Sequence, residues 1–275
     1  MIPPRRFSMP GPATQLPGSK TATRLALMSA PASMNPTAAA VGANLRLVAS
    51  AIDEAARAAG RAPADITLIA VSKTHPAEAV RAAYAAGCRH FGENYVDEAV
   101  QKICTLRDLE ATWHYIGSVQ TNKTRALAEH FDWVHTVDRA RVAERLSAQR
   151  PGNRALDICL QVNIDRDPRK SGVDPAAAAT LLTAVRALPK LRVRGLMTIL
   201  DAAAEPLASY LRLRDLFEHL RPLAPGPWDT LSMGMSDDFP AAIAAGATHI
   251  RVGTAVFGAR SRAAIAANEA ARNLE

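Results

Sequence analysis

The chain has 275 residues, of which 48% are hydrophobic and 21% charged, a composition typical of one large globular domain or two small ones. No apolar stretch approaches 18 residues, which argues against a membrane span. The net charge is +7, but four basic residues and no acidic residue lie in residues 1–33, so removing these four leaves +3. Because the other charges mix in sign along helical stretches, we expect a solvated surface and no nucleic-acid partner.

Residues 1–33 are rich in proline and show little periodicity. We expect a disordered segment, or a spurious extension caused by an upstream start site. The segment is basic and free of acidic residues, like a targeting peptide, but it lacks the apolar h-region of a secretory signal. Helical patterning begins at Met34, so we predict one globular domain over residues 34–275.

Cysteine and histidine spacing bears on redox compartment and metal binding. Cys88, Cys104 and Cys159 are odd in number, far apart and form no CxxC pair. Reduced thiols in a cytoplasmic protein fit this pattern better than a disulfide framework. The seven histidines show neither HxH nor HExxH spacing, so we predict no metal site.

A helical pattern over about 36–60 precedes a regular alternation of strands and helices. Candidate strands are 66–72, 89–93, 113–117, 133–137, 156–163, 193–199, 230–234 and 249–253. Candidate helices lie near 76–86, 95–105, 121–130, 139–149, 175–187, 206–220, 238–245 and 262–274. Several strands are continuous apolar runs, as in parallel strands covered on both faces. We predict an α/β fold, a single (β/α)₈ TIM barrel with an extra N-terminal helix outside it or capping it. An open doubly wound sheet is the main alternative.

Polar residues at the strand ends should gather at one mouth of such a barrel, where function is found. Lys73 ends the first strand in "LIAVSKTHP", and Glu93 and Asn94 end the second. Burial at the mouth would disfavour the charged form of Lys73 and favour an amine that attacks carbonyl groups. The alternative is a salt bridge to Glu93 or a surface lysine.

The last two strands carry features of an anion site. Ser236 in "LSMGMSDDFP" is either a helix N-cap or a phosphate ligand. Gly253 and Thr254 follow the last strand, where glycine lets backbone N–H groups approach an anion. Arg251 lies two residues earlier on the same side of that strand; a structural ion pair is its alternative reading. This arrangement suits pyridoxal 5′-phosphate. The lysine would meet its aldehyde, the turns after the last two strands its phosphate, and the arginine its ring nitrogen.

Eight stretches in order make the chain resemble the pyridoxal 5′-phosphate homeostasis protein family, relatives of the alanine-racemase N-terminal barrel. They are "LIAVSKTHP", "FGENYVDEA", "WHYIGSVQTNKTR", "FDWVHTVD", "LQVNIDRDPRKSG", "RGLMTI", "LSMGMSDDFPAAIAAG" and "RVGTAVFGAR". The resemblance implies a reversible aldimine on Lys73, phosphate contacts from Ser236, Gly253 and Thr254, and Arg251 at the pyridine nitrogen. Asn94 is expected beside the ring. Ser118 stands where the family pattern has proline.

We therefore expect a monomeric protein that carries pyridoxal 5′-phosphate (PLP) within the cell and delivers it to PLP-dependent apoenzymes. An arginine at the ring nitrogen weakens carbanion stabilisation, because a guanidinium cannot accept a proton. The main alternative is a PLP-dependent amino-acid racemase with Tyr115 or His114 as the second base. A third possibility is an aldolase-type barrel whose lysine attacks a sugar phosphate. The charged loop of Asp165, Asp167, Arg169 and Lys170 is expected to cover the mouth or to be solvated.

Overall fold

The computed structural model describes residues 37–201, 203–224 and 226–259. These residues all lie within the compact unit Pro31–Glu275. The predictions for residues 1–33 and for a helix at 262–274 lie outside the described residues.

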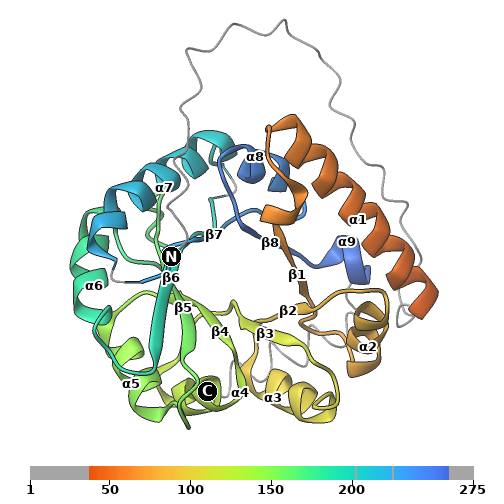
Figure 1. Cartoon of the computed structure of the whole chain (residues 1–275), viewed down its shortest axis with the longest axis horizontal. Coiled ribbons are helices and arrows are strands. Elements are labelled where there is room, and N and C mark those ends of the chain that lie inside the picture. The colour runs from red at the N-terminus through yellow and green to blue at the C-terminus, as the bar shows by residue number, and fades with distance from the viewer. Residues whose placement is uncertain (1–36, 202, 225, 260–275) are drawn as a thin grey trace, which may run out of the picture. The chain divides into compact units, whose positions relative to one another are not determined.

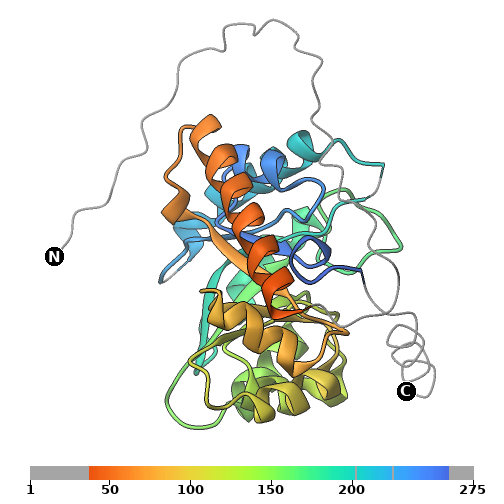
Figure 2. The same ribbon diagram turned by 90° about the vertical axis from the view of Figure 1, so that its right-hand side faces the viewer.

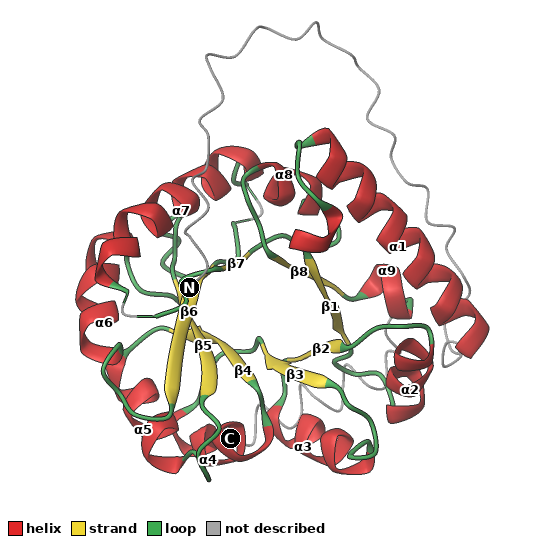
Figure 3. Ribbon diagram, in the orientation of Figure 1, coloured by secondary structure: helices red, strands yellow, loops and turns green. Residues whose placement is uncertain are grey.

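Eight parallel strands close into a barrel in the order of the chain, β1 to β8, as predicted. Figures 1 and 3 show the strands as an inner ring surrounded by helices. The barrel closes because β8 pairs with β1 from Thr67↔His249 to Ala70↔Val252. The strands are β1 Thr67–Val71, β2 His90–Glu93, β3 Thr112–Tyr115, β4 Trp133–Val137, β5 Leu156–Gln161, β6 Leu191–Met197, β7 Thr230–Ser232 and β8 His249–Val252.

The helices between the strands lie near their predicted positions. They are α2 Ala77–Ala85, α3 Val96–Thr105, α4 Thr124–His130, α5 Ala140–Gln149, α6 Ala178–Val185, α7 Pro206–Leu220 and α8 Phe239–Ala244. A further short helix, α9 Thr254–Phe257, follows β8 and was not predicted. None of the helices in the described ranges combines the length and apolar character needed to cross a lipid bilayer.

The extra N-terminal helix, α1 Ala38–Ala58, lies outside the barrel, one of the two predicted placements. It packs against α2, α8 and α9 and so covers the seam where β8 meets β1. Figure 2 shows it running along the side of the barrel. Its buried residues recur at helical spacing, as in Val41, Leu45, Val48 and Ile52, which is the stripe that a helix presents to a core.

The barrel encloses an unusually polar interior. Apolar side chains fill the layer between strands and helices, while Trp133, Cys159 and Met197 form a small separate cluster. Side chains alternate between the two faces of a strand. The residues next to His114 and Arg251 on their strands pack outward, so His114 and Arg251 lie on the inner face of the barrel. Aliphatic side chains usually fill such barrels, so these buried polar residues need a structural or functional explanation.

Candidate functional site

The ends of β8, β1 and β2 lie side by side and bring three of the predicted residues to one mouth of the barrel. Gly253 and Asn94 are the first residues after β8 and β2, and Lys73 is the second residue after β1. β1 pairs with both β8 and β2. Lys73 and Asn94 are both half-buried. The sequence-based expectation that these strand ends meet is confirmed by the barrel order.

Gly253 lies against the backbone of β1. A Cβ atom at this position would be 3.3 Å from the Val71 carbonyl oxygen and 3.4 Å from Val71 Cβ. Its φ is −109°, so the need for glycine comes from this close approach. The N–H groups of Val256 and Phe257 both donate to the Gly253 carbonyl, so α9 begins at Thr254. The first N–H groups of a helix have no partner within it, and those of Thr254 and Ala255 border the mouth.

Ser236 is not a helix N-cap, which corrects one of its two predicted readings. Helix α8 begins at Phe239, and its N-cap residue is Asp238. One Asp238 oxygen accepts from the Met235 N–H at 2.6 Å, and the other accepts from the Tyr210 hydroxyl at 2.8 Å. These bonds occupy the carboxylate within the β7–α8 turn. Within the described residues, the Ser236 hydroxyl forms no hydrogen bond.

Arg251 is a buried cation held by neutral acceptors. Only 4% of the residue is exposed. One guanidinium nitrogen donates to Ser232 Oγ at 3.0 Å, and another donates to the Thr198 carbonyl at 2.9 Å. No carboxylate among the described residues forms an ion pair with it, so the structural ion pair considered for this residue is not found there. Burial lowers the pKa of Arg251, although the charge of Asp238 opposes this shift, because a desolvated charge without an ion-pair partner is unfavourable.

The backbone on both sides of Lys73 is held by a buried ionic cluster on β2 and α3. Lys102 Nζ lies 2.6 Å from Glu93 Oε1 and donates to the Ser72 carbonyl at 2.8 Å. Glu98, which also pairs with Lys102 at 3.0 Å, accepts from the Thr74 N–H at 2.7 Å.

This cluster stabilises an uncommon backbone conformation. Thr74 has φ +66°, a left-handed value that costs free energy for a residue with a branched Cβ. Burial raises the pKa of Glu93, even though the Lys102 ammonium opposes that rise. Glu93 thus pairs with Lys102, a residue that the sequence reasoning missed. The signal was a lysine on the buried stripe of α3, at i, i+3 spacing with Val96 and Ala99.

Three buried polar atoms on residues near Lys73 have no hydrogen-bond partner among the described residues. They are Asn94 Oδ1, Thr74 Oγ1 and Glu93 Oε2. Buried polar atoms in folded proteins are nearly always paired, so an unpaired one needs an explanation. Together with the guanidinium of Arg251 and the Ser236 hydroxyl, they leave hydrogen-bonding capacity at the mouth. These residues fit a ligand that combines an anionic group with polar ring substituents, as pyridoxal 5′-phosphate does.

Neither residue considered as a second base is placed at the mouth. His114 is fully buried inside the barrel, hydrogen-bonded to His90 at 3.0 Å and to His135 at 2.9 Å. Tyr115 is the next residue on β3 and packs against Phe131 in the outer layer, with its hydroxyl donating to the Ser118 carbonyl. Among the described residues, no group of three histidine, cysteine, aspartate or glutamate side chains forms a metal site.

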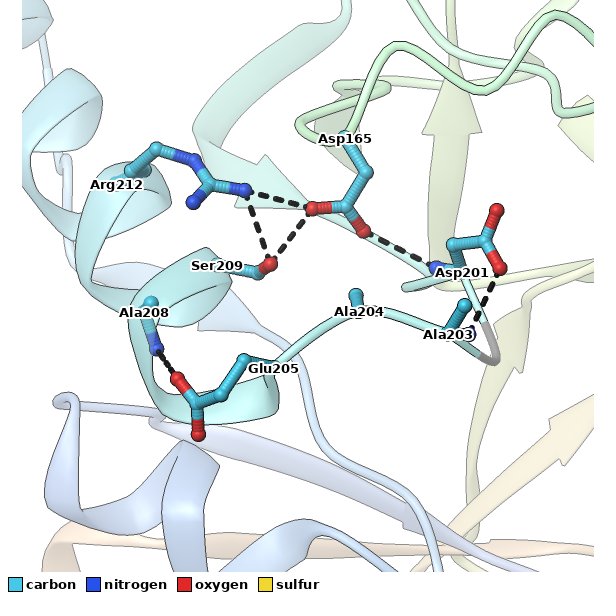
Figure 4. A pocket seen from close by; sticks show the side chains of 8 residues that line it. All are labelled: Asp165, Asp201, Ala203, Ala204, Glu205, Ala208, Ser209 and Arg212. Carbon is cyan, nitrogen blue, oxygen red and sulfur yellow. Dashed lines mark hydrogen bonds and ion pairs between the residues drawn. The ribbon is translucent and has the colours of Figure 1, made fainter.

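A separate pocket of about 300 Å³ lies between the loops that follow β5 and β6 (Figure 4). Asp165 on its wall accepts hydrogen bonds from Ser209, Arg212 and the Asp201 N–H. The charged loop after β5, which was expected to cover the mouth or to be solvated, is therefore hydrogen-bonded to α7 and to the loop that follows β6. None of the six predicted cofactor residues lines this pocket, and its acidic lining does not favour a phosphate group.

Comparison with known proteins agrees with the resemblance carried by the sequence motifs. Residues 43–261 match the family described as "Alanine racemase, N-terminal domain". A pyridoxal phosphate homeostasis protein of Pseudomonas aeruginosa is 55% identical over 221 residues, which are 80% of this chain and 96% of that protein. Its namesake from Escherichia coli K12 is 47% identical over 231 residues, covering 79% and 95%. The solved structure of PipY of Synechococcus elongatus with PLP bound is 41% identical, with a TM-score of 0.70, and the match covers 79% of this chain and all of that one.

Proposed function

We propose, from the premise that this chain belongs to the pyridoxal phosphate homeostasis protein family, that it binds pyridoxal 5′-phosphate reversibly and serves as an intracellular carrier. Relatives that are 55% and 47% identical to this chain carry that name, and PipY has been solved with PLP bound. Recipient apoenzymes are the expected partners in delivery.

The observation that carries this proposal is the environment of Arg251. A buried guanidinium with neutral hydrogen-bond acceptors is costly in the protein without ligand, because the Asp238 carboxylate, which does not pair with it directly, offsets the desolvation of its charge only in part. A ligand with a phosphate dianion would supply the missing counter-charge from across the mouth. Arg251 is two residues before Gly253 on β8, which pairs with β1, the strand that precedes Lys73.

Each predicted residue has a separate role in holding the cofactor. Lys73 supplies the amine, and its condensation with the aldehyde forms a C=N bond and releases one water molecule. Ser236, Gly253 and Thr254 supply a hydroxyl and backbone N–H groups for the phosphate, as anion sites at such turns do. Arg251 donates a hydrogen bond to the ring nitrogen, and Asn94 lies beside the ring.

A carrier role fits these residues better than racemisation. PLP supplies an electron sink for carbanions most effectively when its ring nitrogen is protonated. Arg251 can only donate to that nitrogen, because a guanidinium does not give up or accept a proton at neutral pH. His114 is bound between two imidazoles and Tyr115 faces the outer layer, so neither supplies the second base that a racemase needs.

Absorption spectroscopy, borohydride reduction and peptide mapping test the proposal together. The PLP-loaded protein should absorb near the visible, and reduction should fix one pyridoxyl group on Lys73. Lys73→Ala should abolish the adduct, whereas Lys123→Ala, which changes a half-buried lysine paired with Asp97, should leave it intact. An adduct on another lysine would refute the site assignment. Sustained amino-acid racemisation that Lys73→Ala destroys would refute the carrier role.

A further inference from the structure

A row of hydrogen-bonded side chains runs through the barrel from the first residue of β2 to Arg251. His90 Nδ1 lies 3.0 Å from His114 Nε2, and His114 Nδ1 lies 2.9 Å from His135 Nε2. His135 Nδ1 lies 2.8 Å from Ser232 Oγ, which also receives the Arg251 guanidinium at 3.0 Å. Each residue comes from a different strand: β2, β3, β4, β7 and β8.

The guanidinium fixes the direction of one hydrogen bond in this row. Arginine has no acceptor atom, so Ser232 Oγ must accept from Arg251. The Ser232 hydroxyl then has one proton to donate, and its other partner among the described residues is His135 Nδ1. A neutral imidazole that accepts at Nδ1 carries its proton on Nε2. When Ser232 gives its proton to His135, instead of accepting a second hydrogen bond from it, His135 donates to His114 and His114 in turn donates to His90.

This scheme requires neutral rings, which the burial of the histidines favours. Burial, followed by the charges of neighbouring rings, lowers the pKa of both His114 and His135 well below the ordinary value. The groups facing them inside the barrel are His249 on β8, Trp133 on β4 and the Arg251 cation. Burial lowers the pKa of His249 to about 3. A proton added to one of these imidazoles would be repelled by the positive charge of Arg251, so the row of histidines is not expected to carry a charge.

We propose that Ser232, His135, His114 and His90 form a relay of positioning residues that fixes the Ser232 proton toward His135 and so holds the hydroxyl oxygen in place for Arg251. Ser232 and the Thr198 carbonyl are the two described anchors of the guanidinium. When the Ser232 hydroxyl donates its proton to His135, the lone pairs of its oxygen point toward Arg251. The expected consequence, which rests on the proposed function, is that the relay orients Arg251 toward the pyridine nitrogen of the bound cofactor.

The tautomers can be measured in the empty, unmodified protein by ¹⁵N NMR of labelled histidines. The relay predicts a protonated Nε2 and an unprotonated Nδ1 on both His114 and His135 near neutral pH. A protonated Nδ1 on His135 would mean that the imidazole donates to Ser232, and that result would overturn the relay. The measurement needs no variant and no cofactor, so it stands whether or not the proposed function is correct.

Ser232 variants test the positioning role in the loaded protein. Ser232→Ala should weaken PLP binding about tenfold, the effect of losing one hydrogen bond of roughly 1.4 kcal/mol, and should shift the absorption band of the lysine adduct. Ser232→Thr keeps the hydroxyl and should restore both. Ser147→Ala is the matched control, because Ser147 is also a buried serine, on α5, bonded to the Pro189 carbonyl. It should change neither.

The outcomes separate the two proposals. Unchanged affinity and absorption in folded Ser232→Ala would overturn the positioning role while the adduct on Lys73 stands. If the unmodified protein gives no adduct on Lys73, the proposed function fails, and the histidine tautomers alone then decide whether the relay exists.

Discussion

Lys102 Nζ and Glu93 Oε1 lie 2.6 Å apart, with the two side chains 4% and 0% exposed. The same ammonium binds the carbonyl of Ser72, the residue before Lys73. The ion pair therefore joins α3 to the backbone that carries the proposed reactive amine. A buried pair of this kind contributes little net stability over an apolar pair, but removing one partner leaves an isolated charge. Its clearest role is to hold the segment 72–74 in place.

Replacing Lys102 should destabilise the protein strongly. Lys102→Met leaves the Glu93 carboxylate buried without a counter-charge, so the free energy of unfolding should fall by about 3–5 kcal/mol. Denaturant unfolding measures this change. The double variant Lys102→Met with Glu93→Leu should recover much of the loss, because no charge then remains buried. Arg57→Met is the control, since Arg57 pairs with Asp53 on the exposed face of α1; it should cost less than about 0.5 kcal/mol. Equal losses in the two single variants would contradict this explanation.

Asn94→Ala should separate stability from binding. Asn94 Oδ1 is buried without a partner, so removing it should leave the free energy of unfolding of the empty protein unchanged or raise it by up to about 1 kcal/mol. PLP affinity should fall, because the residue then offers nothing to the ring. Asn163→Ala is the contrast, because the Asn163 side chain donates to the Asp167 carbonyl at 2.7 Å and accepts from its N–H at 3.1 Å. That variant should lose stability. An unstable Asn94→Ala protein would show that Asn94 has a structural role.

Ser236→Ala should affect phosphate recognition alone. The Ser236 hydroxyl has no hydrogen-bond partner among the described residues, so the empty protein should keep its melting temperature. A hydrogen bond to a charged group contributes about 1.5–3 kcal/mol, so PLP affinity should fall about 10- to 100-fold. Affinity for pyridoxal, which has no phosphate, should not change. A parallel loss for both compounds in equilibrium titrations would show that Ser236 does not contact the phosphate.

The buried histidines predict a loss of stability in mild acid. Burial lowers the pKa of His249 to about 3 and places those of His114 and His135 well below the ordinary value. Between the unfolded value of about 6.5 and these folded values, the unfolded chain binds more protons than the native protein. Stability is therefore full above about pH 6.5 and decreases as pH falls, approaching about 1.4 kcal/mol per pH unit for each histidine.

Denaturant unfolding between pH 7 and 5 checks this slope, and two variants assign it. His249→Asn should reduce the slope by about one titrating group. His219→Gln should not change it, because His219 is exposed on α7. A flat stability profile over this range in the unmodified protein would mean that the imidazoles gain protons without unfolding.

Much of the barrel follows from local patterning. β4 and α7 lie at their predicted bounds, and the other strands differ by a few residues at their ends. Two βα segments begin with short 3₁₀ turns, Thr121–Lys123 and Pro175–Ala177, that the pattern assigned to helices. The α9 helix has only four residues, too few for a helical period to be read. The N-cap reading of Ser236 was wrong. The sequence does not show that the Asp238 carboxylate accepts a hydrogen bond from the Met235 N–H.

The sequence by itself determined which polar residues end the strands, because parallel strands of a barrel must bring their carboxyl ends to one mouth. That rule sufficed to bring Lys73, Asn94 and Gly253 together. Only the tertiary structure decided the partners of those residues: Lys102 for Glu93, and Ser232 with Thr198 for Arg251. Periodicity encodes the face on which a side chain lies, but a contact across the barrel depends on the stagger of eight strands at closure. No segment of the chain carries that stagger alone.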